Sequence, residues 1–119
     1  GDEIEADFEQ LRITGGYDHN YVTDGYNKAS IREIAEAWSE ETGIQMNVFT
    51  DCPCVQFYAA NFVDQEHGKN GHVYNKREAF CLETQYFPNA VNEKNFKSPV
   101  LKAGDTYCSV TKYCFGLEK

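Results

Sequence analysis

Long apolar runs are missing from this 119-residue chain, and so is an excess of basic residues. No stretch approaches the roughly 18 consecutive apolar residues of a membrane-spanning helix, and the first residues do not resemble a secretory signal. Lys and Arg number 11 against 19 Asp and Glu, which gives a formal net charge of -8, and the basic residues are not clustered. Because phosphate binding relies on clustered Lys and Arg, we expect neither nucleic acid nor membrane as a partner.

The number of cysteines is odd, so they cannot all pair within the chain. The chain has five, at uneven spacings: Cys52, Cys54, Cys81, Cys108 and Cys114. Such a set does not suit the disulfide framework of a secreted protein, so we expect free thiols and a cytoplasmic location.

What the chain does contain is typical of one all-β segment spanning residues 1–119. Its composition, 41% hydrophobic and 14% aromatic, is sufficient for a single core. From residue 44 onward, clusters of Pro, Gly, Asn and Asp separate short apolar segments, which predicts strands. These segments read "IQMNVFT", "VQFYAANF", "AFCLETQYF" and "TYCSVTKYCF". The long polar segment 63–78 between them is interpreted as a functional loop.

Residues 30–43, "SIREIAEAWSEETG", carry conflicting signals. Ser30 and Glu33 fit a helical capping box, and the apolar residues that follow recur at helical spacing up to Trp38. The stretch "SEETG" before "IQMNVF" also reads as a hairpin turn between two strands. Local signals therefore favour a helix, and a hairpin is the alternative.

Glu83 is the first candidate site residue, because it is a single carboxylate in the middle of a strand that looks buried, "AFCLETQYF". Alternation places Leu82 and Thr84 on one face, and Cys81, Glu83 and Gln85 on the other. A buried carboxylate is usually paired, protonated or retained for chemistry. The interpretations are the wall of a polar pocket or an ordinary pair with Arg or Lys.

Two further segments supply polar side chains. In "VQFYAAN", Gln56 and Tyr58 share a face, and an amide beside an aromatic ring suits a sugar, whose hydroxyls need hydrogen bonds. In "GGYDHNYV", Asp18 and His19 are neighbours, so in a strand they point to opposite faces and at most one shares a pocket with Glu83.

A metal site is a competing interpretation. Cys52, Cys54, His67 and His72 read as C-x-C-x12-H-x4-H, which approaches the spacing of a two-cysteine, two-histidine zinc site. The first pair is one residue too close for such a site, and the intervening segment reads as a strand.

Together these motifs resemble the aldose 1-epimerase family, also called galactose mutarotases. The resemblance rests on "GGYDHNYV" (15–22), "VQFYAANF" (55–62), "GKNGHVYNKREAFCLETQYFPNAVNEKNF" (68–96) and "SPVLKAGDTYCSVTKYCF" (98–115). It implies the C-terminal part of a large antiparallel β-sandwich, the galactose mutarotase-like supersandwich. It also implies that "SIREIAEAW" is a strand paired with "IQMNVFT", against the local helix signals.

The resemblance further implies a function: interconversion of the α and β anomers of aldoses such as galactose and glucose, without a cofactor or a metal. Glu83 would be the general base, Asp18 would bind sugar hydroxyls, and Gln56 would contact the sugar near the reacting end. A desolvated carboxylate base has its pKa moved toward the working pH.

This chain departs from the family in length. The family's enzymes are roughly three times as long, and their two active-site histidines lie upstream of "GYDHN", so His19, His67 and His72 do not correspond to them. The resemblance therefore implies a base without its acid, and a partner that is either the N-terminal remainder or a second copy. A non-catalytic sugar-binding β-sandwich is the alternative.

Overall fold

A computed structural model describes residues 7–27 and 30–117. Among these described residues the regular elements are mostly strands, with one short α-helix and one 3-10 turn. The elements are α1 (Glu9–Thr14), β1 (Asp18–Val22), β2 (Arg32–Trp38), β3 (Ile44–Thr50), β4 (Cys54–Tyr58), β5 (Glu66–His67), η2 (Lys69–Gly71), β6 (Val73–Tyr74), β7 (Cys81–Gln85) and β8 (Thr111–Leu117). The predicted all-β class is confirmed.

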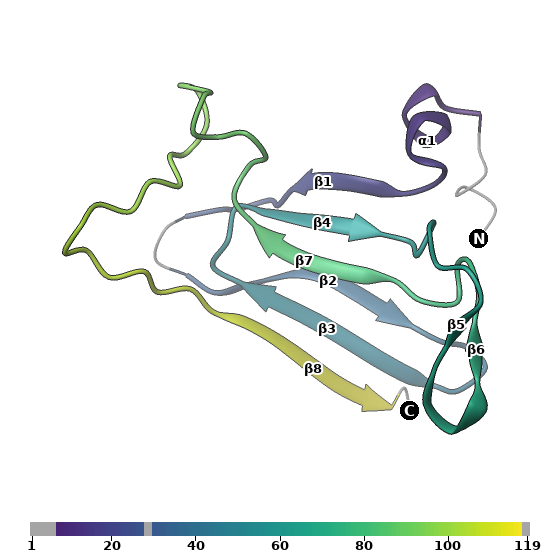
Figure 1. Ribbon diagram of the computed structural model, residues 1–119. Coiled ribbons are helices and arrows are strands. Elements are labelled where there is room, and N and C mark those ends of the chain that lie inside the picture. Colours follow the sequence, from purple (N-terminus) through teal and green to yellow (C-terminus); the bar gives the residue numbers. More distant parts are fainter. Residues whose placement is uncertain (1–6, 28–29, 118–119) are drawn as a thin grey trace. The chain divides into compact units, whose positions relative to one another are not determined.

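The strands form three sheets, with the orders β1-β4-β7, β2-β3-β8 and β5-β6 (Figure 1). The chain divides into two compact units, residues 1–21 with 56–83 and residues 22–55 with 84–119. Within the described ranges, no helix is long and apolar enough to cross a bilayer. All five cysteines are free thiols, as predicted.

In the second unit, residues 32–38 form a strand, so the local helix signals are wrong and the pairing implied by the family resemblance is confirmed. β2 pairs with β3 in antiparallel register from Arg32 with Thr50 to Trp38 with Gln45, with an irregularity between Glu33 and Ala35. The turn closes through hydrogen bonds from Ser39 N to the Ile44 carbonyl at 2.9 Å and from Gly43 N to the Ser39 carbonyl at 2.8 Å. Gly43 has a φ of 68°, which a glycine adopts without strain.

The two faces of the β2-β3-β8 sheet differ in chemistry. On β3, Val48 and Thr50 are fully buried, and Val48 pairs with Tyr113 of β8. Farther along the same face, Phe115 and Leu117 are each 72% exposed. The opposite face carries polar pairs beside Phe49 and Trp38: Asn47 donates a hydrogen bond to Glu33 at 2.6 Å, and Gln45 donates one to Glu36. This sheet therefore has one apolar face whose far end is open.

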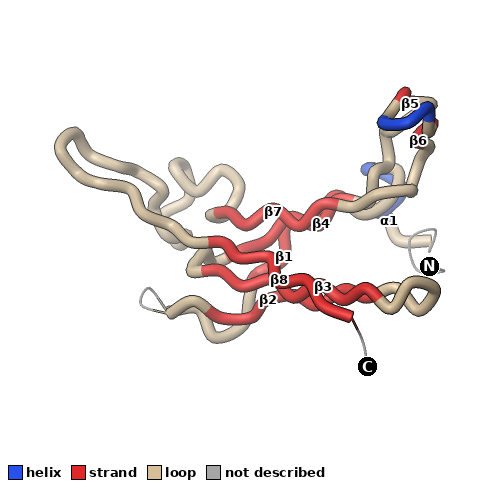
Figure 2. The backbone as a smooth tube through the Cα atoms, turned by 90° about the horizontal axis from the view of Figure 1, so that it is seen from below, coloured by secondary structure: helices blue, strands red, loops and turns tan. Residues whose placement is uncertain are grey.

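Residues 63–78 of the first unit are more ordered than the predicted loop. Figure 2 shows a narrow excursion in which β5 and β6 flank η2. Glu66 pairs with Tyr74 and His67 with Val73. The sequence does not reveal this hairpin, because each of its strands has only two residues and so shows no alternation of apolar and polar positions.

Between β7 and β8 the chain runs without helix or strand (Figure 2). The rings of Phe87 and Phe96 stack with centroids 4.5 Å apart, and Ala90 is buried. Asp105 N donates a hydrogen bond to the Lys102 carbonyl at 3.0 Å, which closes a turn at Gly104. Side-chain packing and turns thus order this segment.

Candidate functional site

The three predicted site residues lie on three neighbouring strands of one sheet. Asp18 begins β1, Gln56 lies in the middle of β4, and Glu83 lies in the middle of β7. The sheet order is β1-β4-β7, so the strand carrying Gln56 lies between the other two (Figure 1). All three residues belong to the first unit.

Asp18 and Gln56 are joined directly. Gln56 Nε2 donates a hydrogen bond of 2.7 Å to Asp18 Oδ1, and both side chains are half-buried. Because neighbouring strands bring side chains of the same face into contact, this bond shows that Asp18 and Gln56 share one face of the sheet. The bond fixes the orientation of a carboxylate that retains acceptor sites for other donors.

Glu83 is exposed, which corrects the expectation of a buried strand. Cys81 and Glu83 are exposed while Leu82 and Thr84 are half-buried, so the predicted alternation is present, but the carboxylate faces open space. The charge therefore carries no large desolvation cost here. The ion pairs of the described residues do not include Glu83, so the alternative of an ordinary pair with Arg or Lys finds no support in residues 7–27 and 30–117.

A tight backbone approach positions the start of β1. The Tyr17 carbonyl accepts hydrogen bonds from Asn61 Nδ2 at 2.7 Å and from Ala59 N at 3.0 Å. Arg77 donates to the Gly15 carbonyl at 3.0 Å. Buried Gly16 has a φ of 139°, and a Cβ there would lie 2.2 Å from Asn61 Oδ1. Tyr17, the residue before Asp18, is thus fixed by hydrogen bonds from the residues that follow β4.

Sequence reasoning did not single out Asn61 and Arg77 as positioning residues. Both lie within stretches that carry the family resemblance, "VQFYAANF" and "GKNGHVYNKRE", and this was the available signal. Their contacts with Tyr17 and Gly15 depend on residues 44 and 62 positions away in sequence, so local patterns do not reveal them.

The side chain of His19 lies on the face of β1 opposite to the Asp18 carboxylate, although its Nδ1 accepts a hydrogen bond of 2.9 Å from the backbone N of Asp18. Its ring meets that of Tyr17 edge to face, with centroids 5.9 Å apart. It lines a cavity of about 230 Å³ with Phe8, Gln10, Leu11, Tyr17 and Tyr21. The prediction that Asp18 and His19 face opposite ways is therefore confirmed.

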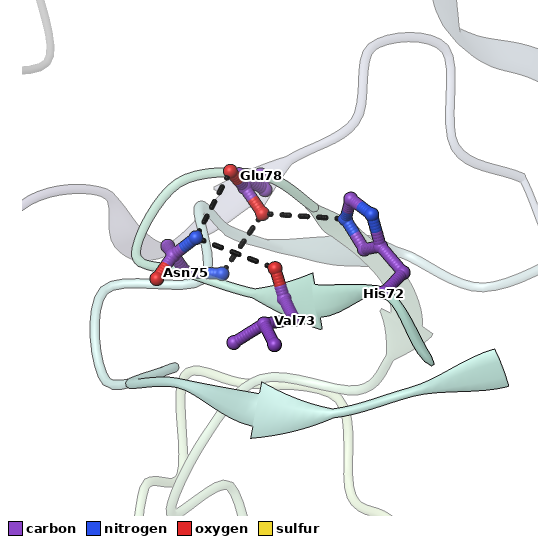
Figure 3. A network of polar contacts seen from close by, with 4 residues as sticks. All are labelled: His72, Val73, Asn75 and Glu78. Atoms are coloured by element: carbon purple, nitrogen blue, oxygen red, sulfur yellow. Dashed lines mark hydrogen bonds and ion pairs between the residues drawn. The ribbon is translucent and has the colours of Figure 1, made fainter. Parts of the chain in front are cut away.

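His72 belongs to a polar network beside the β5-β6 hairpin (Figure 3). Glu78 accepts hydrogen bonds from Asn75 N at 2.9 Å and from Asn75 Nδ2 at 3.3 Å, and His72 Nε2 lies 3.7 Å from Glu78 Oε2. The bonds from Asn75, with the smaller influence of His72, lower the pKa of Glu78. This network orders the turn that follows β6.

The four residues of the zinc interpretation fall in different units: Cys52 and Cys54 belong to the second, and His67 and His72 belong to the first. Within residues 7–27 and 30–117, no three His, Cys, Asp or Glu side chains form a group that could hold a metal ion. Cys52 and Cys54 are buried, whereas His67 and His72 are exposed.

An all-β fold with two carboxylates and an amide on adjacent strands defines the class of the site: a polar sheet surface that offers several hydrogen-bond acceptors and one amide donor. The family model for aldose 1-epimerase matches residues 1–114. The chain therefore belongs to the aldose 1-epimerase family.

Individual relatives agree with this assignment. Galactose mutarotase of Homo sapiens is 39% identical over 103 residues, which cover 86% of this chain and 30% of that protein. Galactose mutarotase of Bos taurus is 39% identical over 116 residues, covering 97% and 33%. Aldose 1-epimerase of Escherichia coli is 29% identical over 115 residues, covering 95% and 33%. The chain thus spans about a third of the length of these relatives.

A solved structure agrees as well. The crystal structure of the GalM/aldose epimerase homologue from C. elegans superposes with a TM-score of 0.76 at 28% sequence identity. The superposition covers 86% of this chain and 30% of that one. The fold is therefore that of the aldose epimerase β-sandwich, of which this chain supplies a part.

Proposed function

We propose that residues 1–119 are one segment, the C-terminal part, of an aldose 1-epimerase that interconverts the α and β anomers of aldoses such as galactose and glucose in the cytoplasm. The observation that carries this proposal is the placement of Asp18, Gln56 and Glu83 on adjacent strands, with Asp18 and Gln56 hydrogen-bonded. The galactose mutarotases among the relatives support it.

In the proposed reaction, Glu83 is the general base. Its carboxylate takes the proton from the C1 hydroxyl while an acid protonates the ring oxygen, and the C1–O5 bond breaks to give the open-chain aldehyde. Rotation about C1–C2 lets the C5 hydroxyl add to the other face of the carbonyl, which inverts the anomer. In this closing step Glu83 returns its proton to the C1 oxygen, and the acid takes back the proton of the C5 hydroxyl. An exposed carboxylate is accessible to a sugar that binds in an open cleft.

Asp18 and Gln56 hold the sugar in this proposal. Asp18 accepts hydrogen bonds from sugar hydroxyls, and Gln56 contacts the sugar near the reacting end. The bond between the two side chains restricts their rotation before the sugar arrives. A site that is ordered in advance loses less entropy on binding.

The acid is proposed to come from outside this chain. His19 lies on the face of β1 opposite to Asp18, beside Tyr17. His67 and His72 lie in and next to the β5-β6 hairpin, where His72 approaches Glu78. The acid histidine is therefore assigned to the N-terminal remainder of the enzyme.

The apolar face of the β2-β3-β8 sheet is the proposed contact for that remainder. Phe115 and Leu117 are each 72% exposed there, next to Ile44 at 48%. Exposed apolar side chains that adjoin on one sheet face are typical of a surface that another part of the protein covers. The relatives are about three times as long as this chain, so the occupant to which we commit is the missing part of the sandwich.

The experiment that tests the proposal is a chimera. Residues 1–119 replace the corresponding third of bovine galactose mutarotase, and polarimetry follows the mutarotation of α-D-galactose. Glu83→Gln should lower kcat by about 100-fold or more, because general acid–base catalysis contributes at least that factor. Glu41→Gln, in the exposed turn before β3, is the matched control and should leave kcat unchanged. Full activity of the Glu83→Gln chimera would contradict the proposal.

A second candidate, a sugar-binding β-sandwich that does no chemistry, is favoured by one observation: the histidine nearest in sequence to Asp18 faces away from it. It predicts that the chimera binds galactose but does not accelerate mutarotation, with or without Glu83. Calorimetric titration with galactose beside the polarimetric assay distinguishes the two candidates.

A further inference from the structure

We propose a second ligand site in the unit formed by residues 22–55 and 84–119, for a small hydroxy carboxylate such as an open-chain sugar acid. The site is a cavity of about 280 Å³. Its lining combines one cation, one carboxylate, a phenol, a hydroxyl and two thiols: Asp51, Cys52, Tyr86, Lys97, Cys108 and Ser109. None of the residues Asp18, Gln56 and Glu83 contributes to it.

Lys97 supplies the binding group for the anion. Its Nζ lies 4.6 Å from the ring centroid of Tyr26 and 4.7 Å from that of Tyr86, so two aromatic faces hold the ammonium. The side chain is half-buried, and this burial lowers the pKa of Lys97. No hydrogen bond or ion pair joins Lys97 to another residue of the described part of the chain. Its N–H donors are therefore available to an anionic ligand, which would offset the cost of desolvating the charge.

Asp51 supplies a fixed acceptor. Its Oδ1 accepts hydrogen bonds from Ser109 Oγ at 2.8 Å and from Val110 N at 3.0 Å. Burial alone would raise the pKa of Asp51, but these hydrogen bonds and the positive charge of Arg32 lower it, so the carboxylate is ionised. A carboxylate has about four lone-pair sites, so it retains capacity to accept bonds from ligand hydroxyls.

Ser109 links the carboxylate to a buried thiol. Its Oγ lies 3.3 Å from Cys52 Sγ as well as 2.8 Å from Asp51 Oδ1. On the other side, burial and the nearby Tyr107, Cys52 and Asp51 raise the pKa of Tyr86, so its phenol keeps its proton and can donate. The wall of the cavity is thus ordered and polar around the two charges.

Charge and size select the ligand. Lys97 and Asp51 are the only charged residues that line the cavity, and their charges cancel. A single cation beside a carboxylate suits a monoanion better than a phosphate dianion, which Asp51 would repel. The volume is just below the range of about 300 to 1,000 Å³ that is typical of drug-sized pockets, which favours a small ligand. A carboxylate for Lys97 and hydroxyls for Asp51 together describe a hydroxy acid.

The test is calorimetric titration of the 119-residue chain with D-gluconate. Sorbitol, a neutral polyol of the same length, and glucose 6-phosphate are the comparison ligands. Lys97→Met should weaken gluconate binding by about tenfold or more, because hydrogen bonds to charged groups contribute at least that much. Lys97→Arg, which keeps the charge, should retain most of the affinity. Lys102→Met removes an exposed lysine outside the cavity and should change nothing.

Each outcome decides the proposal. Gluconate binding that survives Lys97→Met, equal binding of sorbitol, or tighter binding of glucose 6-phosphate would overturn the hydroxy-acid site. If Lys97→Met fails to fold by circular dichroism, Asp51→Asn replaces it, and unchanged gluconate affinity in that variant would overturn the site equally. Glu83→Gln should leave gluconate binding intact, so the failure of this site and the failure of the proposed epimerase function are separate results.

Discussion

Gln56 Nε2 donates a hydrogen bond of 2.7 Å to Asp18 Oδ1 and so connects two strands through their functional side chains. The bond involves a carboxylate, and both groups are half-buried, which makes it stronger than an exposed pair of neutral groups. We therefore expect Asp18 and Gln56 to act as one unit in stability as well as in sugar binding.

The first prediction concerns the coupling of these two residues. Asp18→Ala and Gln56→Ala should each destabilise the chain, and the double variant should lose less free energy of unfolding than the two single losses together. The coupling should be about 1 to 3 kcal/mol, since hydrogen bonds to charged groups fall in that range. Urea unfolding of the four proteins measures it. Additive losses would show that the bond contributes nothing.

The second prediction concerns Gly16, where the backbone before Asp18 passes close to Asn61. Gly16→Ala places a Cβ 2.2 Å from Asn61 Oδ1 at a φ of 139°, so it combines a clash with a strained backbone. We expect a loss of about 2 kcal/mol or more in the free energy of unfolding.

Gly15→Ala is the matched control for this prediction. Gly15 also has a positive φ, 67°, but nothing lies within 4 Å of its Cβ position. The loss in free energy of unfolding of Gly15→Ala should therefore stay near the cost of a non-glycine residue in the left-handed conformation, about 1 kcal/mol. Thermal and urea unfolding compare the two variants. Equal losses would mean that the close approach of Asn61 has no role in holding the start of β1.

The third prediction concerns the apolar face of the β2-β3-β8 sheet. Without the rest of the sandwich, copies of this chain should associate through Phe115 and Leu117, which are each 72% exposed. Sedimentation equilibrium should give a mass above the 13.6 kDa of one chain, and Phe115→Lys should return it toward that value. Cys114→Ser, whose residue lies on the opposite face of β8, is the control. A monodisperse wild-type monomer would contradict the assignment of this face.

The sequence predicts the strands well where turn residues bound them. β3 and β7 lie within the predicted segments, and β4 and β8 overlap theirs, with β4 beginning at Cys54 and β8 ending at Leu117. At residues 30–38 the sequence wrongly favours a helix, because the capping box and the helical spacing reflect only local preferences. The strand is decided by pairing with β3, a contact outside the reach of those signals. Family resemblance corrected the error because it carries information on long-range pairing.

The site shows the same contrast between what local sequence predicts and what depends on distant parts of the chain. Residue types and the family resemblance single out Asp18, Gln56 and Glu83 as candidates, and the structure places them on adjacent strands, with their roles a matter for the proposed experiments. Alternation places His19 on the other face from the Asp18 carboxylate. The exposure of Glu83 could not be predicted, because it depends on what covers the sheet and not on the strand's own sequence. The cavity of Lys97 was also missed, since its lining comes from four separate stretches of the chain.

The register of β8 has a consequence for the order in which the chain acquires its structure. β2 and β3 are joined by a short turn, so their hairpin closes a small loop, whereas Thr50 and Thr111 come together across 61 residues. Loop closure of that length is entropically unfavourable and slows folding. The hairpin should therefore form early and β8 should join last. During synthesis one edge of β3 therefore stays unpaired until residues 111–117 have left the ribosome.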